Sequence, residues 1–112
     1  MLIYKILRSS EWEELQVNGA ILGAPVDLSD GFVHFSTASQ VAETAARHFA
    51  QQDGLWLLAY DADGFGNALK WEASRGGALF PHLYAPLRYS DAVWACPLPL
   101  CASGHVLPDG LK

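Results

Sequence analysis

Residues 55–61, with the sequence LWLLAYD, form the longest nearly continuous apolar run in the central part of the chain. A run of this length is typical of a β-strand, and strands that are apolar at successive positions are usually covered on both faces. We therefore predict that residues 55–61 form a central strand of a sheet. The rest of the chain must then supply apolar cover on two sides, which suits a sequence in which 51% of the residues are hydrophobic.

The segments around this run predict further strands and two main helices. Alternating apolar residues predict strands over 2–8 and 68–74, and shorter extended segments over 32–36, 80–87 and 91–96. A Ser10–Glu13 capping box and the Asn18-Gly19 stop predict a short helix within 9–19. Thr37 and Gln40 predict the start of a second helix over 38–51, whereas 24–31 (APVDLSDG) has the composition of a turn-rich loop. The order of elements favours an α+β fold, because helices do not alternate with strands to the end.

The chain reads as a single domain over residues 1–96 followed by an irregular tail over 97–112, where prolines and glycines gather. Within the domain, Phe49 and Trp71 lie in elements with apolar periodicity, and we expect both to anchor the core. Cys96 and Cys101 are five residues apart, a spacing that matches neither a zinc site nor a C-x-x-C redox pair. Both are expected to be reduced, structural thiols.

Charge and patterning exclude several classes of function. The net charge is -5 and no cluster of lysine or arginine occurs, which argues against binding to a nucleic-acid backbone. The N-terminus lacks the basic region and the cleavage site of a signal peptide, and apolar runs are too broken by polar residues to span a membrane. A cytoplasmic protein is expected, of unknown oligomeric state.

A first group of candidate residues lies in DGFVHFST, residues 30–37. In an extended strand, Phe32, His34 and Ser36 share one face while Val33 and Phe35 share the other. A histidine and a serine beside one aromatic ring suit the wall of a pocket. The alternative is a histidine held by hydrogen bonds in the core, because histidine is often partly buried.

A second group comprises Glu72, His82 and Tyr84, with His82 and Tyr84 on the same face of an extended segment. Carboxylate, imidazole and phenol groups serve proton transfer or bind sugar hydroxyls. We predict that the imidazoles of His34 and His82 lie within about 12 Å of one another across one pocket, with Glu72 at its rim. A structural role for these side chains is the alternative.

Two other arrangements are less well supported by the sequence. His34 and His82 with Glu72 or Asp30 could form a metal site, but no local ligand spacing supports one, and we predict none. A Ser36, His82 and Asp27 triad would lack the G-x-S-x-G elbow of hydrolases.

The blocks IYKILRSSEW, DLSDGFVHFSTASQ, LKWE and FPHLYAPL resemble the DUF952 family of small bacterial proteins of unknown function, over residues 3 to about 93. The resemblance is carried by two motifs of that family. The matching positions are Asp30, Gly31, Phe32, Val33, His34, Ser36 and Gln40, then Trp71, Glu72, Phe80, Pro81, His82, Leu83, Tyr84 and Leu87. Ala85 stands where the family usually has glycine.

This resemblance implies a fold like that of ADP-ribosyltransferases, a split antiparallel sheet with an NAD cleft. More distantly, FVHFS is similar to a strand of RNA 2′-phosphotransferases, whereas Lys5 stands where those enzymes have a nucleotide-holding histidine. The resemblance therefore implies a cleft for a nucleotide-like, anionic or sugar-bearing small molecule, with NAD or a related nucleotide as cofactor or ligand. Transferase chemistry is put in doubt, and a non-catalytic binding or interaction module is the alternative.

The resemblance also assigns roles to individual residues. Glu72 and His82 would be catalytic in an enzyme, with Glu72 polarising a ribose hydroxyl or stabilising an oxocarbenium-like centre. The remaining residues would bind the ligand: Lys5, Asp30, His34, Ser36 and Tyr84.

Overall fold

The computed structural model describes residues 1–111, with Arg75 described by its backbone alone. The α-helices are α1 (Ser9–Asn18), α2 (Pro25–Asp30) and α3 (Val41–His48). The strands are β1 (Leu2–Leu7), β2 (Ala20–Ile21), β3 (Val33–His34), β4 (Leu55–Asp61), β5 (Leu69–Ala73), β6 (Leu79–Leu83), β7 (Leu87–Arg88), β8 (Ala92–Leu98), β9 (Leu100–Cys101) and β10 (Gly104–His105). Short 3-10 helices are η1 (Ala62–Ala68), η2 (Arg75–Gly77) and η3 (Tyr89–Asp91). The chain is thus a mixed α and β protein with antiparallel sheets.

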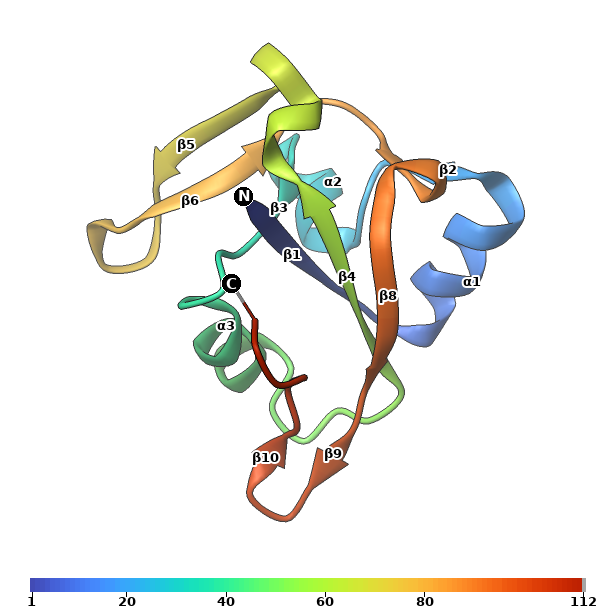
Figure 1. Cartoon of the computed structure of the whole chain (residues 1–112), viewed down its shortest axis with the longest axis vertical. Helices are drawn as coiled ribbons and strands as arrows, with labels where there is room; N and C mark the ends of the chain where they lie inside the picture. The colour runs from blue at the N-terminus through green and yellow to red at the C-terminus, as the bar shows by residue number, and fades with distance from the viewer. Residues whose placement is uncertain (112) are drawn as a thin grey trace.

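Two three-stranded antiparallel sheets form the frame of the molecule. The first has the order β1-β4-β8, which confirms that residues 55–61 are a central strand, and the second has the order β3-β6-β5. Figure 1 shows β4 between β1 and β8, with β5 and β6 projecting away to one side. The sheets meet at one bridge, in which Tyr4 and Ser36 exchange backbone hydrogen bonds of 2.8 and 2.9 Å. Along the rest of β1, the edge opposite β4 has no strand partner among the described residues.

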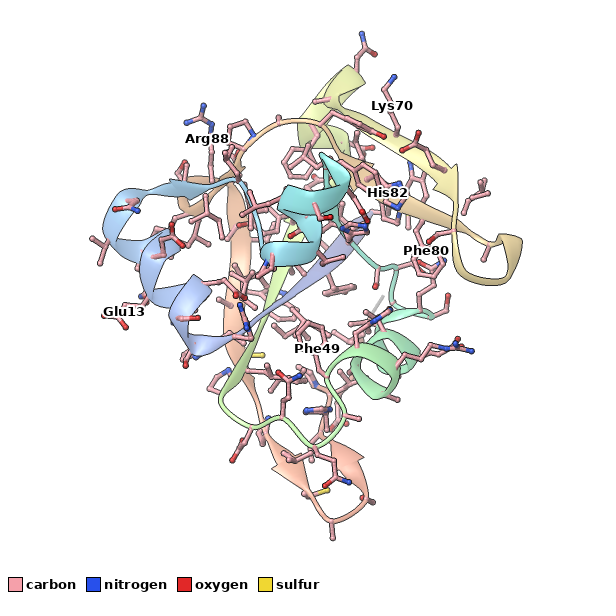
Figure 2. All side chains as sticks on the ribbon, turned by 180° about the vertical axis from the view of Figure 1, so that it is seen from behind. Glu13, Phe49, Lys70, Phe80, His82 and Arg88 are labelled. Atoms are coloured by element: carbon pink, nitrogen blue, oxygen red, sulfur yellow. The ribbon has the colours of Figure 1, made fainter. Side chains whose placement is uncertain are left out.

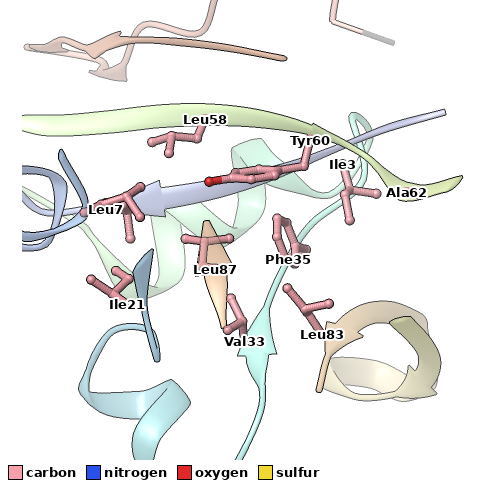
Figure 3. Packing of buried hydrophobic residues seen from close by; sticks show 11 residues of the cluster. Ile3, Leu7, Ile21, Val33, Phe35, Leu58, Tyr60, Ala62, Leu83 and Leu87 are labelled. Atoms are coloured by element: carbon pink, nitrogen blue, oxygen red, sulfur yellow. The ribbon is translucent and has the colours of Figure 1, made fainter. Parts of the chain in front are cut away.

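Apolar side chains cover both faces of the first sheet, as the apolar run predicts. One cluster includes Leu58 and Tyr60 of β4 and is closed by side chains of β3, β6 and β7, as Figure 3 shows. The other includes Leu57 and is closed by α3, whose Val41 and Ala45 are buried. Successive residues of β4 therefore enter different clusters.

The helix ends differ from the sequence prediction at the start of α1 and at both ends of α3. Helix α1 does not use a Ser10–Glu13 box; instead the Glu11 carboxylate accepts from the backbone N–H of Arg8 at 3.0 Å. Its predicted stop is confirmed, since Gly19 adopts a left-handed conformation (φ 80°). Helix α3 spans only Val41–His48, shorter than the predicted 38–51.

The predicted loop 24–31 is wrong, because residues Pro25–Asp30 form α2. Proline in the first turn and Gly31 in a left-handed conformation after the last turn define its ends. The carboxylate of Asp27 accepts from the backbone N–H of Ala24 at 2.7 Å, which satisfies a donor at the helix start. The same residue types serve turns and helix caps, so composition alone did not separate the two.

Two further expectations need correction. Strand β8 continues through Pro97 to Leu98, and β9 and β10 form a hairpin, so the tail is not irregular over 97–105. Trp71 is not a core anchor, because it is 40% exposed, whereas Phe49 is partly buried against the second cluster. That residues 1–96 form one domain stays a prediction.

Candidate functional site

A cavity of about 510 Å³ lies along the free edge of β1, between α2, β3 and α3. Figure 2 shows Phe49, Phe80 and His82 around this region of the molecule. Several of the predicted site residues line it: Lys5, Asp30, His34, Ser36 and His82. Aromatic side chains contribute too, including Tyr4, Phe49 and Phe80.

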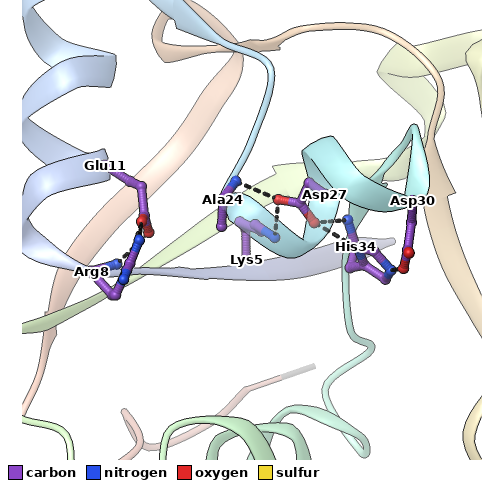
Figure 4. A network of polar contacts seen from close by, with 7 residues as sticks. All are labelled: Lys5, Arg8, Glu11, Ala24, Asp27, Asp30 and His34. Carbon is purple, nitrogen blue, oxygen red and sulfur yellow. Dashed lines mark hydrogen bonds and ion pairs between the residues drawn. The ribbon is translucent and has the colours of Figure 1, made fainter.

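Asp27 is the centre of the ionic network on one wall of this cavity (Figure 4). Its Oδ2 accepts from the Lys5 ammonium at 2.8 Å and from the Ala24 N–H at 2.7 Å. Its Oδ1 faces the backbone nitrogen of His34 at 3.0 Å and the ring Nδ1 of His34 at 2.6 Å. Four donors therefore meet one fully buried carboxylate.

The charges of this network are paired inside the protein. Burial alone would raise the pKa of Asp27, but the hydrogen bonds from His34 and Lys5 and the charge of Lys5 bring that pKa down to about 2. Burial lowers the pKa of the Lys5 ammonium, and the adjacent Asp27 carboxylate opposes that change. The Asp27 carboxylate is ionised, because four hydrogen-bond donors strongly favour its charged form.

His34 lies between two carboxylates. Its Nδ1 contacts Asp27, and its Nε2 lies 2.9 Å from Oδ2 of Asp30, which is half exposed. Both ring nitrogens therefore have carboxylate partners within the protein. The ring is 28% exposed, and its nitrogens are committed to protein partners. His34 thus offers the cavity a ring edge rather than a free nitrogen.

His82 lies beside His34, because β3 and β6 pair with His34 opposite His82. The ring centroids are 5.4 Å apart, which confirms the predicted separation of less than about 12 Å. Phe32 stacks on His82 with a centroid distance of 4.1 Å and an interplanar angle of 24°. The two groups of candidate residues therefore meet across one strand pair.

Glu72 and Tyr84 are joined to His82 but do not line the cavity among the described residues. Oε1 of Glu72 lies 2.9 Å from Nδ1 of His82 and accepts from the Tyr84 hydroxyl at 2.7 Å. Hydrogen bonds from Tyr84 and His82 lower the pKa of Glu72, and the bond to Glu72 raises the pKa of Tyr84. The prediction that Glu72 lies on the rim is therefore wrong, and Glu72 reaches the cavity only through His82.

The two alternative constellations do not form. Ser36 Oγ is bonded to Thr44 Oγ1 at 2.8 Å, and Asp27 contacts His34 rather than His82, so no Ser-His-Asp triad exists. Over residues 1–111, no group of three histidine, cysteine or acidic side chains is arranged to hold a metal ion. Cys96 and Cys101 are both free thiols.

Some contributors to the site were not assigned a role from the sequence. Arg8 and Glu11 both line the cavity and form an ion pair with each other. Asp27 was considered only as a triad member, although its position in the first turn of a helix that begins with proline was the available signal. Nothing local in the sequence connects Asp27 with Lys5.

Comparison with known proteins places these features in a family. The profile of a family described as "Protein of unknown function (DUF952)" matches residues 6–95. The crystal structure of protein CC0527 from Caulobacter crescentus is 50% identical in sequence, with a TM-score of 0.90 over 94% of this chain and 92% of that one. The solution NMR structure of CC0527 is 51% identical, with a TM-score of 0.83 over 93% and 90% of the two chains.

No match was found among curated proteins. Within the described residues, no helix is both long and apolar enough to cross a membrane. The profile match over residues 6–95 includes the motifs around His34 and His82, and the sequence identity to CC0527 supports the same relationship. The chain belongs to the DUF952 family of proteins of unknown function.

Proposed function

We propose that this protein binds a small nucleotide-like molecule, one that carries a sugar and a limited negative charge, in the cavity along β1. The observation that carries the proposal is the convergence of Lys5, His34 and His82 on one cavity from three separate segments. A volume of about 510 Å³ falls within the usual range of about 300–1,000 Å³ for small-molecule sites. Structural side chains alone would have no need to share an open cavity.

The composition of the cavity wall supports an amphipathic ligand. Phe49 and Phe80 offer aromatic surface on which a planar ring can pack. The Lys5 side chain is 6% exposed, and its ammonium group has Asp27 as a hydrogen-bond partner, which leaves two N–H groups for a ligand oxygen. Ring stacking with an adjacent polar contact is the combination that a nucleoside monophosphate requires.

The charges on the wall argue against recognition by charge alone. The ammonium of Lys5 pairs with the carboxylate of Asp27, and the guanidinium of Arg8 pairs with the carboxylate of Glu11. An inorganic anion would gain little from a wall whose cations are already paired. Shape and hydrogen bonding are therefore expected to dominate, which favours a monophosphate over a polyphosphate.

We also infer that the two sheets correspond to the split sheet of ADP-ribosyltransferase-like folds, with the cavity at the split. The single Tyr4–Ser36 bridge between the sheets supports this assignment. Glycosyl or ADP-ribosyl transfer is the finer proposal that follows from the resemblance. In that case Glu72 would act through His82, because Glu72 has no position on the cavity wall among the described residues.

A thermal-shift screen tests the binding proposal with AMP, ADP-ribose, NAD and ribose 5-phosphate, and with inorganic phosphate and adenine as component controls. A ligand at 100 times its Kd stabilises the fold by about 2.7 kcal/mol. For a domain of this size that corresponds to a rise in Tm of about 10 °C. Lys5→Met should remove the response to the phosphate-bearing probes. If no nucleotide raises the Tm at millimolar concentration, the proposed ligand class is wrong.

A further inference from the structure

The two ring nitrogens of His82 have different surroundings. Nδ1 lies 2.9 Å from Oε1 of Glu72, a carboxylate whose pKa is lowered by its bonds to Tyr84 and His82. An ionised carboxylate only accepts hydrogen bonds, so Nδ1 must carry the proton. In the neutral ring, Nε2 is then left with a lone pair.

Nε2 of His82 has no hydrogen-bond partner among the described residues, although the residue is 4% exposed and lines the cavity. No buried side-chain nitrogen or oxygen in the described part of the chain lacks a partner, so Nε2 is open to the cavity rather than sealed. Phe32 stacks on the ring and Glu72 holds Nδ1, which fixes the ring plane. A hydrogen-bond partner for Nε2 must therefore be a molecule bound in the cavity.

Lys5 and His82 present complementary groups to the same space. Lys5 contributes N–H donors, and Nε2 of His82 contributes an acceptor. A molecule that satisfies both must carry an oxygen acceptor and, separately, an O–H or N–H donor. His34 cannot supply the acceptor, because both of its ring nitrogens contact carboxylates.

We propose that Nε2 of His82 is the hydrogen-bond acceptor for a ligand hydroxyl in this cavity, with Glu72 as the residue that positions it. The assignment rests on the proposed function for the identity of the ligand. As the hydroxyl donates to Nε2, the positive charge that builds up on the ring lies beside the Glu72 carboxylate, which compensates it. The Tyr84 hydroxyl donates a hydrogen bond to the same oxygen, Oε1, of that carboxylate.

The protein without ligand gives the first test. Long-range proton–nitrogen NMR correlations at about pH 8, where histidines are mostly neutral, report which ring nitrogen carries the proton. We expect His82 in the Nδ1–H form in the wild type and a mixture of forms in Glu72→Gln, because an amide can either accept or donate. A wild-type His82 protonated at Nε2 would overturn the assignment, whatever the protein binds.

The second test compares AMP with 2′,3′-dideoxy-AMP, which lacks both ribose hydroxyls, by calorimetry. We expect the wild type to bind AMP about tenfold more tightly, and His82→Phe, which keeps a ring against Phe32, to bind both equally. His105→Phe removes a partly exposed histidine that does not itself line this cavity, although its partner Gln52 does, and should keep the tenfold preference.

The ratio of the affinities for AMP and 2′,3′-dideoxy-AMP distinguishes a His82 that binds the ligand from a His82 that is only structural. A purely structural His82 would weaken both ligands alike and leave the ratio unchanged, which overturns the proposal. Glu72→Gln, a change at a partly exposed side chain, should reduce the ratio while the protein stays folded. If AMP does not bind the wild type at all, the proposed function fails, and the tautomer of His82 still decides its assignment.

Discussion

Replacing Asp27 by asparagine should be among the most damaging isosteric changes in this protein. The substitution keeps the shape of a side chain with no exposed surface but removes the charge that faces the Lys5 ammonium at 2.8 Å. In the wild type, each oxygen of the Asp27 carboxylate accepts from two donors. Asparagine replaces one of these oxygens by an NH₂ group, so the two donors at that position lose their acceptor. Breaking a buried pair by removing one partner costs about 3–5 kcal/mol, and we expect Asp27→Asn to cost that much.

The same carboxylate should make stability depend on acid. The pKa of Asp27 falls from 3.8 to about 2 on folding, which corresponds to about 2 kcal/mol. Because the folded pKa is the lower one, this stability is fully present above pH 3.8 and is lost as the pH falls through about 2. Asp27→Asn should lack this component, so its unfolding free energy should change less than that of the wild type between pH 5 and pH 2.

Urea denaturation at pH 7 and along a series to low pH measures both effects. Asp30→Asn is the matched control: it contacts the same His34 ring, but its side chain is 46% exposed, and it should cost less than about 1 kcal/mol. The double variant Lys5→Met with Asp27→Asn should recover part of the loss, because no unpaired buried charge remains. A loss below 1 kcal/mol for Asp27→Asn, or an unchanged acid dependence, would refute the account of this network.

Four further substitutions test the packing, two of them as a matched pair of glycines. In urea denaturation, Gly23→Ala should lower the free energy of unfolding more than Gly31→Ala. Both glycines have positive φ, but only at Gly23 would the new Cβ lie 2.4 Å from the Asp27 carboxylate. Equal losses would show that the carboxylate moves aside freely. Trp71→Ala should cost less than about 1 kcal/mol because the side chain is 40% exposed. Replacing a fully buried phenylalanine by alanine costs about 3–5 kcal/mol, and Phe49→Ala should cost less because Phe49 is only partly buried. A loss of about 3–5 kcal/mol would show that Phe49 belongs to the core.

Local patterns predicted most strands, because alternation reports the faces of a strand directly. The shared face of His34 and Ser36 follows from that period of two, whereas the strand over 55–61 follows from its nearly continuous apolar run. Helix α2 was missed because Pro25 and Gly31 are as typical of turns as of helix ends. The choice depended on burial of the intervening Asp27, which no local pattern encodes.

The candidate site was predicted in outline but not in its connections. The motifs indicated that His34 and His82 act together, and strand pairing brings their rings to 5.4 Å. The pairing of Lys5 with Asp27 joins residues from β1 and α2, and only the folded arrangement decides that a lysine in an apolar strand meets a carboxylate. Whether Glu72 lines the cavity likewise depends on the fold, because its carboxylate contacts His82 at Nδ1.

The contacts on the two sides of the cavity divide cleanly along the chain. Among the described residues, the ionic contacts of Asp27 involve residues up to His34 and those of His82 involve residues within 72–84, and β3–β6 pairing joins the two sets. During synthesis from the N-terminus, the first set is complete in sequence long before the second emerges. The two sets can also diverge separately in evolution: substitutions within 72–84 can alter the acceptor that a ligand meets while leaving intact the charge pairs that the first 34 residues form.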